Sequence, residues 1–348
     1  MDFFNLVLIA AALVAIYFFF KLYIVFLDYY IDTFSLVPHW VIWVIVIFFP
    51  PFLILVISAF FRNSQNKYQQ ENHSYYDTGV DLYLAGDFQA AQQSFLIPAL
   101  RGNSDAMLLL SIIYVQEKNN EQAFHWARKA YETNPKDDAI LLHLAQLHFG
   151  GIGTAKDFLT CRALCKKIEA STLGSPGSNI TVKSVSHDLV ARTYLLGNND
   201  GWDDLRSYKN IEKAITFFEL SGQSGYLPAY ERLGDLLITG DHEVPKNIER
   251  GVEYLKIAAK GGCMMAPNIL YHHFIGQTEN PLRFHQIYLW GKLLVYWGVN
   301  NIDPNIDNIR ESLETSELTS LDFEIKSYIE QFNEQECHIF NEGAREEL

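Results

Sequence analysis

Long apolar stretches at the start of the chain separate two regions of different character. Residues 3–27 and 37–61 are almost continuously apolar, and residues 1–61 contain only four charged side chains. As a helix, each stretch would be about 37 Å long, which is enough to cross a hydrocarbon core of roughly 30 Å. The pattern therefore predicts two transmembrane helices, at about 3–27 and 37–61, followed by a linker over residues 62–71.

The flanking charges indicate how the predicted hairpin crosses the membrane. Arg62 and Lys67 follow the second stretch, whereas the turn over residues 28–36 contains no lysine or arginine. Because positive residues favour the cytoplasmic side, we expect an integral protein of the inner (plasma) membrane with its repeat region in the cytoplasm. Lys21 favours the opposite orientation if the first span ends before it, which leaves a periplasmic or ER-luminal position as the alternative.

Beyond residue 72, apolar and small residues recur at a fixed distance. The sequence KNIEKAITFF at residues 209–218 returns as KNIERGVEYL at residues 246–255, an offset of 37 residues. In a sequence with helical periodicity, this period predicts helix–turn–helix units stacked as a solenoid. We expect about six units over residues 72–300, interrupted by a loop rich in serine and glycine over residues 171–186 and by an excursion over residues 198–208.

One unit resembles the tetratricopeptide repeat (TPR). In such a unit, small side chains let two antiparallel helices approach closely, larger side chains fill the space between them, and a proline follows the second helix. In the unit that begins at Ser104, these positions are Leu110, Ser111, Tyr114, Ala123, Ala130 and Pro135. The resemblance implies an antiparallel helix pair.

From about residue 139, the pattern resembles the longer Sel1-like repeat, which has glycines in the turn between its helices. The matching positions are Gly151, Gly153, Tyr194, Ala214, Phe217, Leu233, Gly234, Gly240, Tyr254, Ala258 and Ala259. His148 stands where tyrosine is usual. The predicted fold class is therefore all-α, with two N-terminal transmembrane helices, an α-solenoid of TPR and Sel1-like repeats, and a C-terminal capping helix.

Negative charge is concentrated in the C-terminal segment. Residues 303–348 carry 13 acidic and 3 basic side chains, a net charge of −10 out of −14 for the whole chain. Apolar side chains spaced by three and four residues predict one amphipathic helix that caps the solenoid; they are Leu318, Leu321, Ile325, Tyr328 and Phe332. The acidic balance argues against a nucleic-acid-binding protein, because phosphate contacts need clustered lysine and arginine.

The chain contains no recognised catalytic motif. His143, His148, Cys161 and Cys165 are of the types that bind zinc, so a zinc-binding or catalytic protein is one alternative. Packing is the preferred interpretation, because both cysteines occupy positions of small core residues and His148 the position of a packing aromatic residue. We therefore expect neither an enzyme nor a bound cofactor, metal or small-molecule substrate.

Aromatic and acidic side chains are the candidates for contact with a partner. Tryptophan and tyrosine dominate interface hot spots, but aromatic residues also fill cores. An acidic helix face can cap an array or bind a basic segment. These candidates are Trp202, Trp290, Tyr296, Trp297, Glu314, Glu317, Asp322 and Glu324.

The resemblance to TPR and Sel1-like repeats implies a function in protein–protein interaction. Together with the predicted anchor, it suggests a scaffold or adaptor that assembles or regulates a bacterial inner-membrane complex of the secretion, pilus or polysaccharide-export type. Its partners would then be other subunits of that complex. The alternative orientation would instead give a periplasmic or ER-luminal protein that acts in quality control or envelope maintenance.

Overall fold

The computed structural model describes residues 70–171, 182–197, 209–277, 283–299 and 306–334, together with Lys21, Ser58 and Arg62. Apart from Lys21 and Ser58, the two predicted transmembrane stretches lie outside the described residues. Among the described residues, no helix is both long enough and apolar enough to span a bilayer. The chain divides by its contacts into a unit of residues 1–73 and a unit of residues 74–348, and the second unit is described below.

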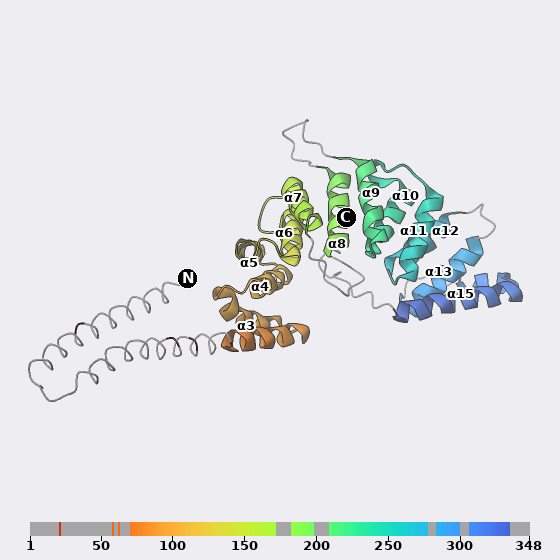
Figure 1. The fold of residues 1–348 in the computed structure, drawn as a ribbon. Helices are drawn as coiled ribbons and strands as arrows, with labels where there is room; N and C mark the ends of the chain where they lie inside the picture. Colours follow the sequence, from red (N-terminus) through yellow and green to blue (C-terminus); the bar gives the residue numbers. More distant parts are fainter. Residues whose placement is uncertain are drawn as a thin grey trace, which may run out of the picture. The chain divides into compact units, whose positions relative to one another are not determined.

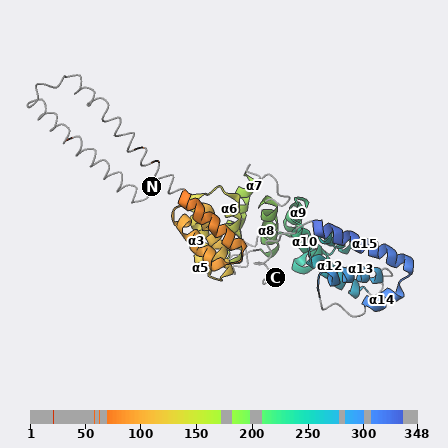
Figure 2. The same ribbon diagram turned by 90° about the horizontal axis from the view of Figure 1, so that it is seen from below.

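The helices of this unit follow one another as pairs joined by turns or loops (Figures 1 and 2). The first pair is α3 (Phe88–Leu100) with residues 74–84, which are the part in this unit of a helix that begins at residue 70. The last two residues of the predicted linker are therefore helical. The later pairs are α4 (Ser104–Gln116) with α5 (Asn120–Thr133), α6 (Asp138–Gly150) with α7 (Phe158–Glu169), α8 (Val182–Leu196) with α9 (Ile211–Gln223), α10 (Pro228–Thr239) with α11 (Ile248–Lys260), and α12 (Met265–Gly276) with α13 (Arg283–Tyr296). A short 3-10 helix, η1 (Asp241–Glu243), lies between α10 and α11. From α3 to α13, each helix packs on the one before it.

Asparagine and aspartate side chains begin most of these helices. The side-chain oxygen accepts a hydrogen bond from a backbone N–H two or three residues later, which satisfies a donor that the first helical turn leaves free. This N-cap is present at Asp87, Asn103, Asn119, Asp137, Asp157, Asn210 and Asn247. The recurring Lys-Asn-Ile-Glu of the sequence is therefore the capped start of α9 and of α11.

Glycines in the turns have backbone conformations that other residues adopt only with strain. Gly151 and Gly240 end α6 and α10 in the left-handed region, with φ of +71° and +76°. Gly153 has a φ of +67°, and a Cβ atom there would collide with the carbonyl oxygen of Asn120 and lie 2.7 Å from the Cβ of Phe124. The turn after α6 therefore packs directly on α5 of the preceding pair, and glycine is the residue that fits this position.

The predicted signature positions form the interior between the helices. Leu110, Ala123, Ala130, Ala214, Leu233, Gly234, Ala258 and Ala259 are buried. Tyr114, Tyr194, Phe217 and Tyr254 are partly buried and pack against the same cores. Pro135 follows the C-cap of α5, where a helix end was expected. In this structure the signature positions are thus packing positions.

The prediction of a loop over residues 171–186 is wrong for its last five residues. α8 begins at Val182, and Ser184 and Ser186 are buried within the packed helices. The Ser221 hydroxyl donates a 2.6 Å hydrogen bond to the Ser184 carbonyl oxygen, and the Ser186 hydroxyl bonds to a carbonyl oxygen of its own helix. Small serines can therefore line a close helix contact, which composition alone does not show. The rest of this loop from residue 172, and the excursion that contains Trp202, lie outside the described residues.

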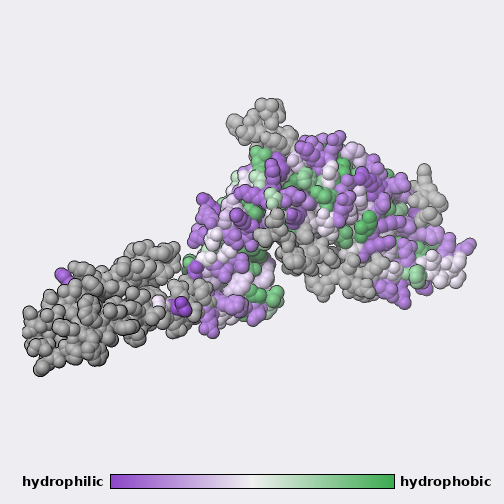
Figure 3. Space-filling view, in the orientation of Figure 1, coloured by the Kyte–Doolittle hydropathy of each residue, from purple (hydrophilic) through white to green (hydrophobic). Residues whose placement is uncertain are grey.

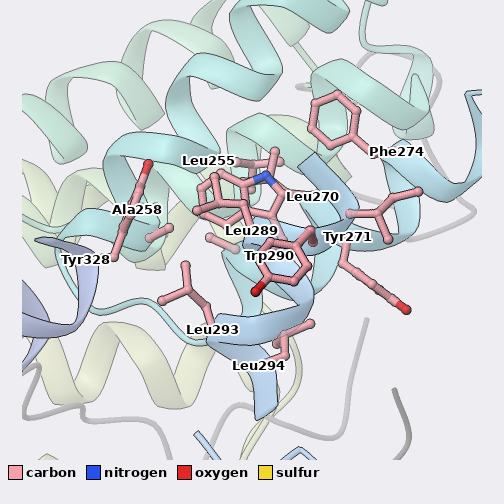
Figure 4. Packing of buried hydrophobic residues seen from close by; sticks show 14 of the residues in the cluster. Leu255, Ala258, Leu270, Tyr271, Phe274, Leu289, Trp290, Leu293, Leu294 and Tyr328 are labelled. Carbon is pink, nitrogen blue, oxygen red and sulfur yellow. The ribbon is translucent and has the colours of Figure 1, made fainter. Parts of the chain in front are cut away.

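The C-terminal segment forms two helices where one was predicted. These are α14 (Ile306–Ser312) and α15 (Thr315–Glu334); both contact α13, and α15 also contacts α11. On α15, Leu321 and Tyr328 are buried, and Leu318 and Ile325 pack partly buried against the same core. The predicted apolar face is confirmed for these four residues, while the side chain of Phe332 lies outside the described part of the chain. Figure 4 shows Tyr328 beside residues of α11 and α13.

Candidate interaction surfaces

A groove of about 380 Å³ lies between α5, α6 and α7. Its lining is mainly apolar and comes from two adjacent helix pairs; the residues are Phe124, Arg128, Tyr131, Leu144, His148, Thr160, Ala163, Leu164 and Lys167. In the view of Figure 3, hydrophobic residues occur as small separate patches among hydrophilic ones, so this face carries no single large hydrophobic surface. A concave apolar site with a few polar groups is the kind of surface that receives a ligand side chain.

His148 lies in the lining of the groove as a packing residue. Its ring meets the ring of Phe124 edge-on, with 5.4 Å between the ring centroids. Burial lowers the pKa of His148 below its ordinary value, and the nearby carboxylate of Asp157 opposes this shift only in part. The neutral imidazole is thus favoured, which agrees with its predicted role in place of a packing tyrosine.

Two basic side chains border the groove. The Lys167 ammonium donates a 2.6 Å hydrogen bond to the Tyr131 hydroxyl and lies 5.1 Å from the centre of that ring. Arg128 pairs with Glu132 one turn away at 3.0 Å, and because both side chains are well exposed, this pair adds little stability. The border therefore offers positive charge next to an apolar lining.

The structure does not bring the four candidate zinc ligands together as a metal site. Within the described ranges, no group of three histidine, cysteine, aspartate or glutamate side chains is placed to hold a metal ion. Cys161 and Cys165 are buried in the core around α7, where their mutual hydrogen bond and burial raise the pKa of the Cys161 thiol. Since zinc binds the thiolate, this environment opposes metal binding. His143 contacts the Ser111 hydroxyl at 2.8 Å.

Trp290 is a core residue, so it is not available as an anchor for a partner. Its ring is 0% exposed and meets the Tyr328 ring of α15 edge-on at 5.2 Å, while its Nε1–H donates to Gln286 at 3.1 Å (Figure 4). The packing alternative therefore holds for Trp290. Trp297 packs partly buried against the same core, whereas Tyr296 is 53% exposed.

Two of the four acidic candidates stabilise the C-terminal helix. Glu317 accepts hydrogen bonds from the backbone N–H of Glu314 at 2.9 Å and from Nε2 of His285 on α13 at 3.0 Å. These bonds lower the pKa of Glu317, and the first of them closes the start of α15 as in a capping box. Asp322 accepts a 3.3 Å bond from the Tyr288 hydroxyl. Glu314 and Glu324 are exposed.

A buried charged cluster on α8 and α10 was not predicted from the sequence. Asp188 and Arg232 form a 2.7 Å ion pair although 44 positions separate them. The available signal was the charged pair Asp188 and Arg192, one helical turn apart in a segment otherwise poor in charge. Without the register between helix pairs, that signal does not differ from an ordinary exposed pair.

Four segments of the chain match the family model of the Sel1 repeat, at residues 104–133, 141–168, 193–226 and 227–263. The first of them covers α4 and α5, the unit that resembles a TPR by its signature positions, so this unit matches the Sel1 model as well. Comparison with curated proteins gives no match.

The chain is also similar to several solved structures. A Sel1 repeat protein from Oxalobacter formigenes shares 19% identity, over 72% of this chain and 98% of that one, with a TM-score of 0.48. A Sel1 repeat protein from Klebsiella pneumoniae shares 18% sequence identity, over 63% of this chain and 99% of that one, with a TM-score of 0.39. The protective antigen c5321 of uropathogenic Escherichia coli has an SLR fold. It shares 18% sequence identity, over 76% of this chain and 70% of that one, with a TM-score of 0.30. The helix pairs and their buried signature positions show that the described region is an all-α solenoid, and four of its segments match the Sel1 repeat.

Proposed function

We propose that this chain is a scaffold for protein–protein interaction and that the groove between α5, α6 and α7 holds an apolar side chain of its partner. The groove itself carries the proposal, because it combines a volume of about 380 Å³, a mainly apolar lining and the positive charges of Arg128 and Lys167. An aromatic or aliphatic anchor in such a pocket supplies much of the affinity of a protein interface. The proposal assigns the chain no catalytic step, cofactor or nucleic acid.

The finer part of the proposal is that the scaffold is anchored in the inner membrane, with its repeats in the cytoplasm, and assembles or regulates a membrane complex. The apolar stretches at residues 3–27 and 37–61 support it, as do Arg62 and Lys67 after them. An anchor would raise the effective concentration of the groove for other membrane-bound subunits.

Membrane extraction and a reporter fusion test the anchor. We expect the full chain to stay in the membrane fraction after alkaline carbonate treatment, and a reporter fused after residue 69 to be active only as a cytoplasmic fusion. Release into the soluble fraction would contradict the anchor. An exported reporter signal would reverse the orientation and favour the periplasmic or luminal alternative.

A groove-filling substitution tests the interaction site. Ala163 is exposed on α7 and lines the groove, so Ala163→Phe should occupy the space without disturbing the core. We expect affinity capture of the tagged full chain from native membranes, followed by quantitative mass spectrometry, to show at least a tenfold loss of one or more specific partners. Ala170→Phe places the same side chain at the exposed C-cap of α7, outside the groove lining, and should retain them. Equal recovery of every partner with both variants would refute the groove as the site.

A further inference from the structure

A second polar site lies away from the groove, where α6, α8 and α10 supply side chains to one cluster. Asp188 and Arg192 stand one turn apart on α8, Arg232 is on α10, Tyr226 precedes α10, and Phe149 is on α6. The first helices of three successive units therefore contribute to it. The groove uses none of these residues.

Arg232 is the arginine of this cluster that forms an ion pair. Its Nη1 donates to Asp188 at 2.7 Å, and the exposed fractions of the two side chains are 20% and 5%. A hydrogen bond also joins Arg232 to the Tyr226 hydroxyl. Burial by itself would lower the pKa of Arg232, but Asp188 and Tyr226 outweigh it and raise this pKa. The Asp188 carboxylate is therefore committed to Arg232.

Arg192, unlike Arg232, stacks on an aromatic ring and has no ion-pair partner of its own among the described residues. Its guanidinium lies 4.4 Å from the centre of the Phe149 ring, and the side chain is partly buried. Within the described part of the chain, the Arg192 guanidinium donates no hydrogen bond and forms no ion pair. Burial lowers the pKa of Arg192, and Asp188 counters this effect only in part. Two guanidinium groups thus share the Asp188 carboxylate, and Glu231 is a further carboxylate that acts on Arg232.

We propose that Arg192, beside Arg232, binds an aspartate or glutamate side chain in an acidic segment of a partner protein; this rests on the proposed scaffold function. A guanidinium stacked on an aromatic ring keeps its in-plane N–H groups free, and these match both oxygens of a carboxylate. A partly buried cation that shares its one carboxylate with a second guanidinium is only partly neutralised, and an incoming carboxylate removes that cost. The Phe149 ring holds the guanidinium in place for this contact.

Peptide binding to the purified full chain tests the proposal. The probes are a fluorescein-labelled peptide of alternating glutamate and leucine, and the same peptide with glutamine in place of glutamate, measured by fluorescence anisotropy. We expect the glutamate peptide to bind at least tenfold more tightly. Arg192→Gln should remove most of this difference, whereas Arg192→Lys, which keeps the charge but not the planar fork, should retain part of it. Arg310→Gln removes an exposed arginine on α14 that belongs to neither site, and it should change nothing.

A stability measurement separates recognition from a structural role. Arg192→Gln removes a charge that forms no ion pair of its own with the described residues, so the thermal unfolding midpoint should stay unchanged or rise. Arg232→Gln breaks a buried ion pair and should lower the midpoint. Equal affinity for the two peptides, or a loss of stability in Arg192→Gln as large as that in Arg232→Gln, would overturn the proposal. Because the peptides act on the isolated chain, failure here is distinct from failure of the groove in partner capture.

Discussion

At the scale of the residue, the tightest constraints come from the neighbouring helix pair. Gly153 lies against Asn120 of the preceding pair, and His143 on α6 bonds to Ser111 on α4. Neither contact connects residues of the same helix. Substitutions at Gly153 and His143 therefore report on the contact between units, which local helix propensity does not determine.

The turn at Gly153 provides a matched pair of substitutions. Gly153 has a φ of +67°, and a Cβ atom added there by Gly153→Ala would also collide with the backbone of Asn120. Gly102 has a φ of +93°, but a Cβ atom added by Gly102→Ala would have no atom within 4 Å. We expect Gly153→Ala to lower the free energy of unfolding by about 2–4 kcal/mol and Gly102→Ala by only about 1 kcal/mol. Urea unfolding followed by circular dichroism measures both. Equal losses would mean that the contact with α5 adds nothing.

His143 should make stability depend on pH. The single hydroxyl proton of Ser111 goes to the Ala123 carbonyl oxygen at 2.6 Å, so the hydroxyl accepts from Nε2–H of a neutral His143. Burial lowers the pKa of His143 from 6.5 to about 4. The unfolded chain therefore takes up a proton first, and the stabilisation is complete above pH 6.5 and is lost as the pH falls toward 4. The loss is roughly 3 kcal/mol.

Unfolding measured from pH 7 to pH 4 checks this prediction. His143→Gln should flatten the slope between pH 6.5 and 4, while the exposed His125→Gln should leave it as in the original chain. An unchanged slope in the His143 variant would assign the pH dependence to other groups.

At the scale of the element, local signals predicted the helix pairs well. The N-caps, the spacing of small residues and Pro135 act within a few residues of one another, so the sequence shows them directly. The predictions were wrong where packing between helices, rather than local sequence, determines the structure. Serines in α8 are buried contacts rather than loop residues. α14 is positioned by Ile306, whose side chain packs tightly on Gly291 of α13. A Cβ atom added to Gly291 would collide with the Ile306 side chain.

In the candidate sites, too, the sequence predicts the roles that depend on local pattern and misses the contacts between helix pairs. The packing roles of His148, Cys161 and Cys165 could be predicted because their positions match those of the repeat. The cluster of Arg192 and Arg232 could not, because its members lie on different helix pairs and meet only through the register of the stack. Glu317 looked like a free acidic residue, but it caps α15 and bonds to α13.

At the scale of the whole molecule, contacts run mainly between successive helices. From α3 to α13, each helix packs on its predecessor. Larger contacts beyond nearest neighbours join α6 with α8, α10 with α12, α11 with α15 and α13 with α15, and single side-chain bonds join α4 with α6 and α8 with α10. In such an array, stability is approximately a sum of terms for the units and for the interfaces between them. A change at one end should therefore leave distant units unaffected.

Tyr328→Ala tests this independence. Tyr328 is 3% exposed and packs its ring against Trp290, so its loss should open a cavity and cost about 3 kcal/mol locally. We expect hydrogen exchange of the full chain, followed by mass spectrometry, to become faster in α11, α13 and α15 and to stay unchanged in α4 to α7. Phe323→Ala removes an aromatic ring that is 77% exposed on the same helix and should change neither region. Faster exchange throughout the array in the Tyr328 variant would show that the described helices unfold as one cooperative block, and the solenoid would then transmit events at its C-terminal cap to the groove between α5 and α7.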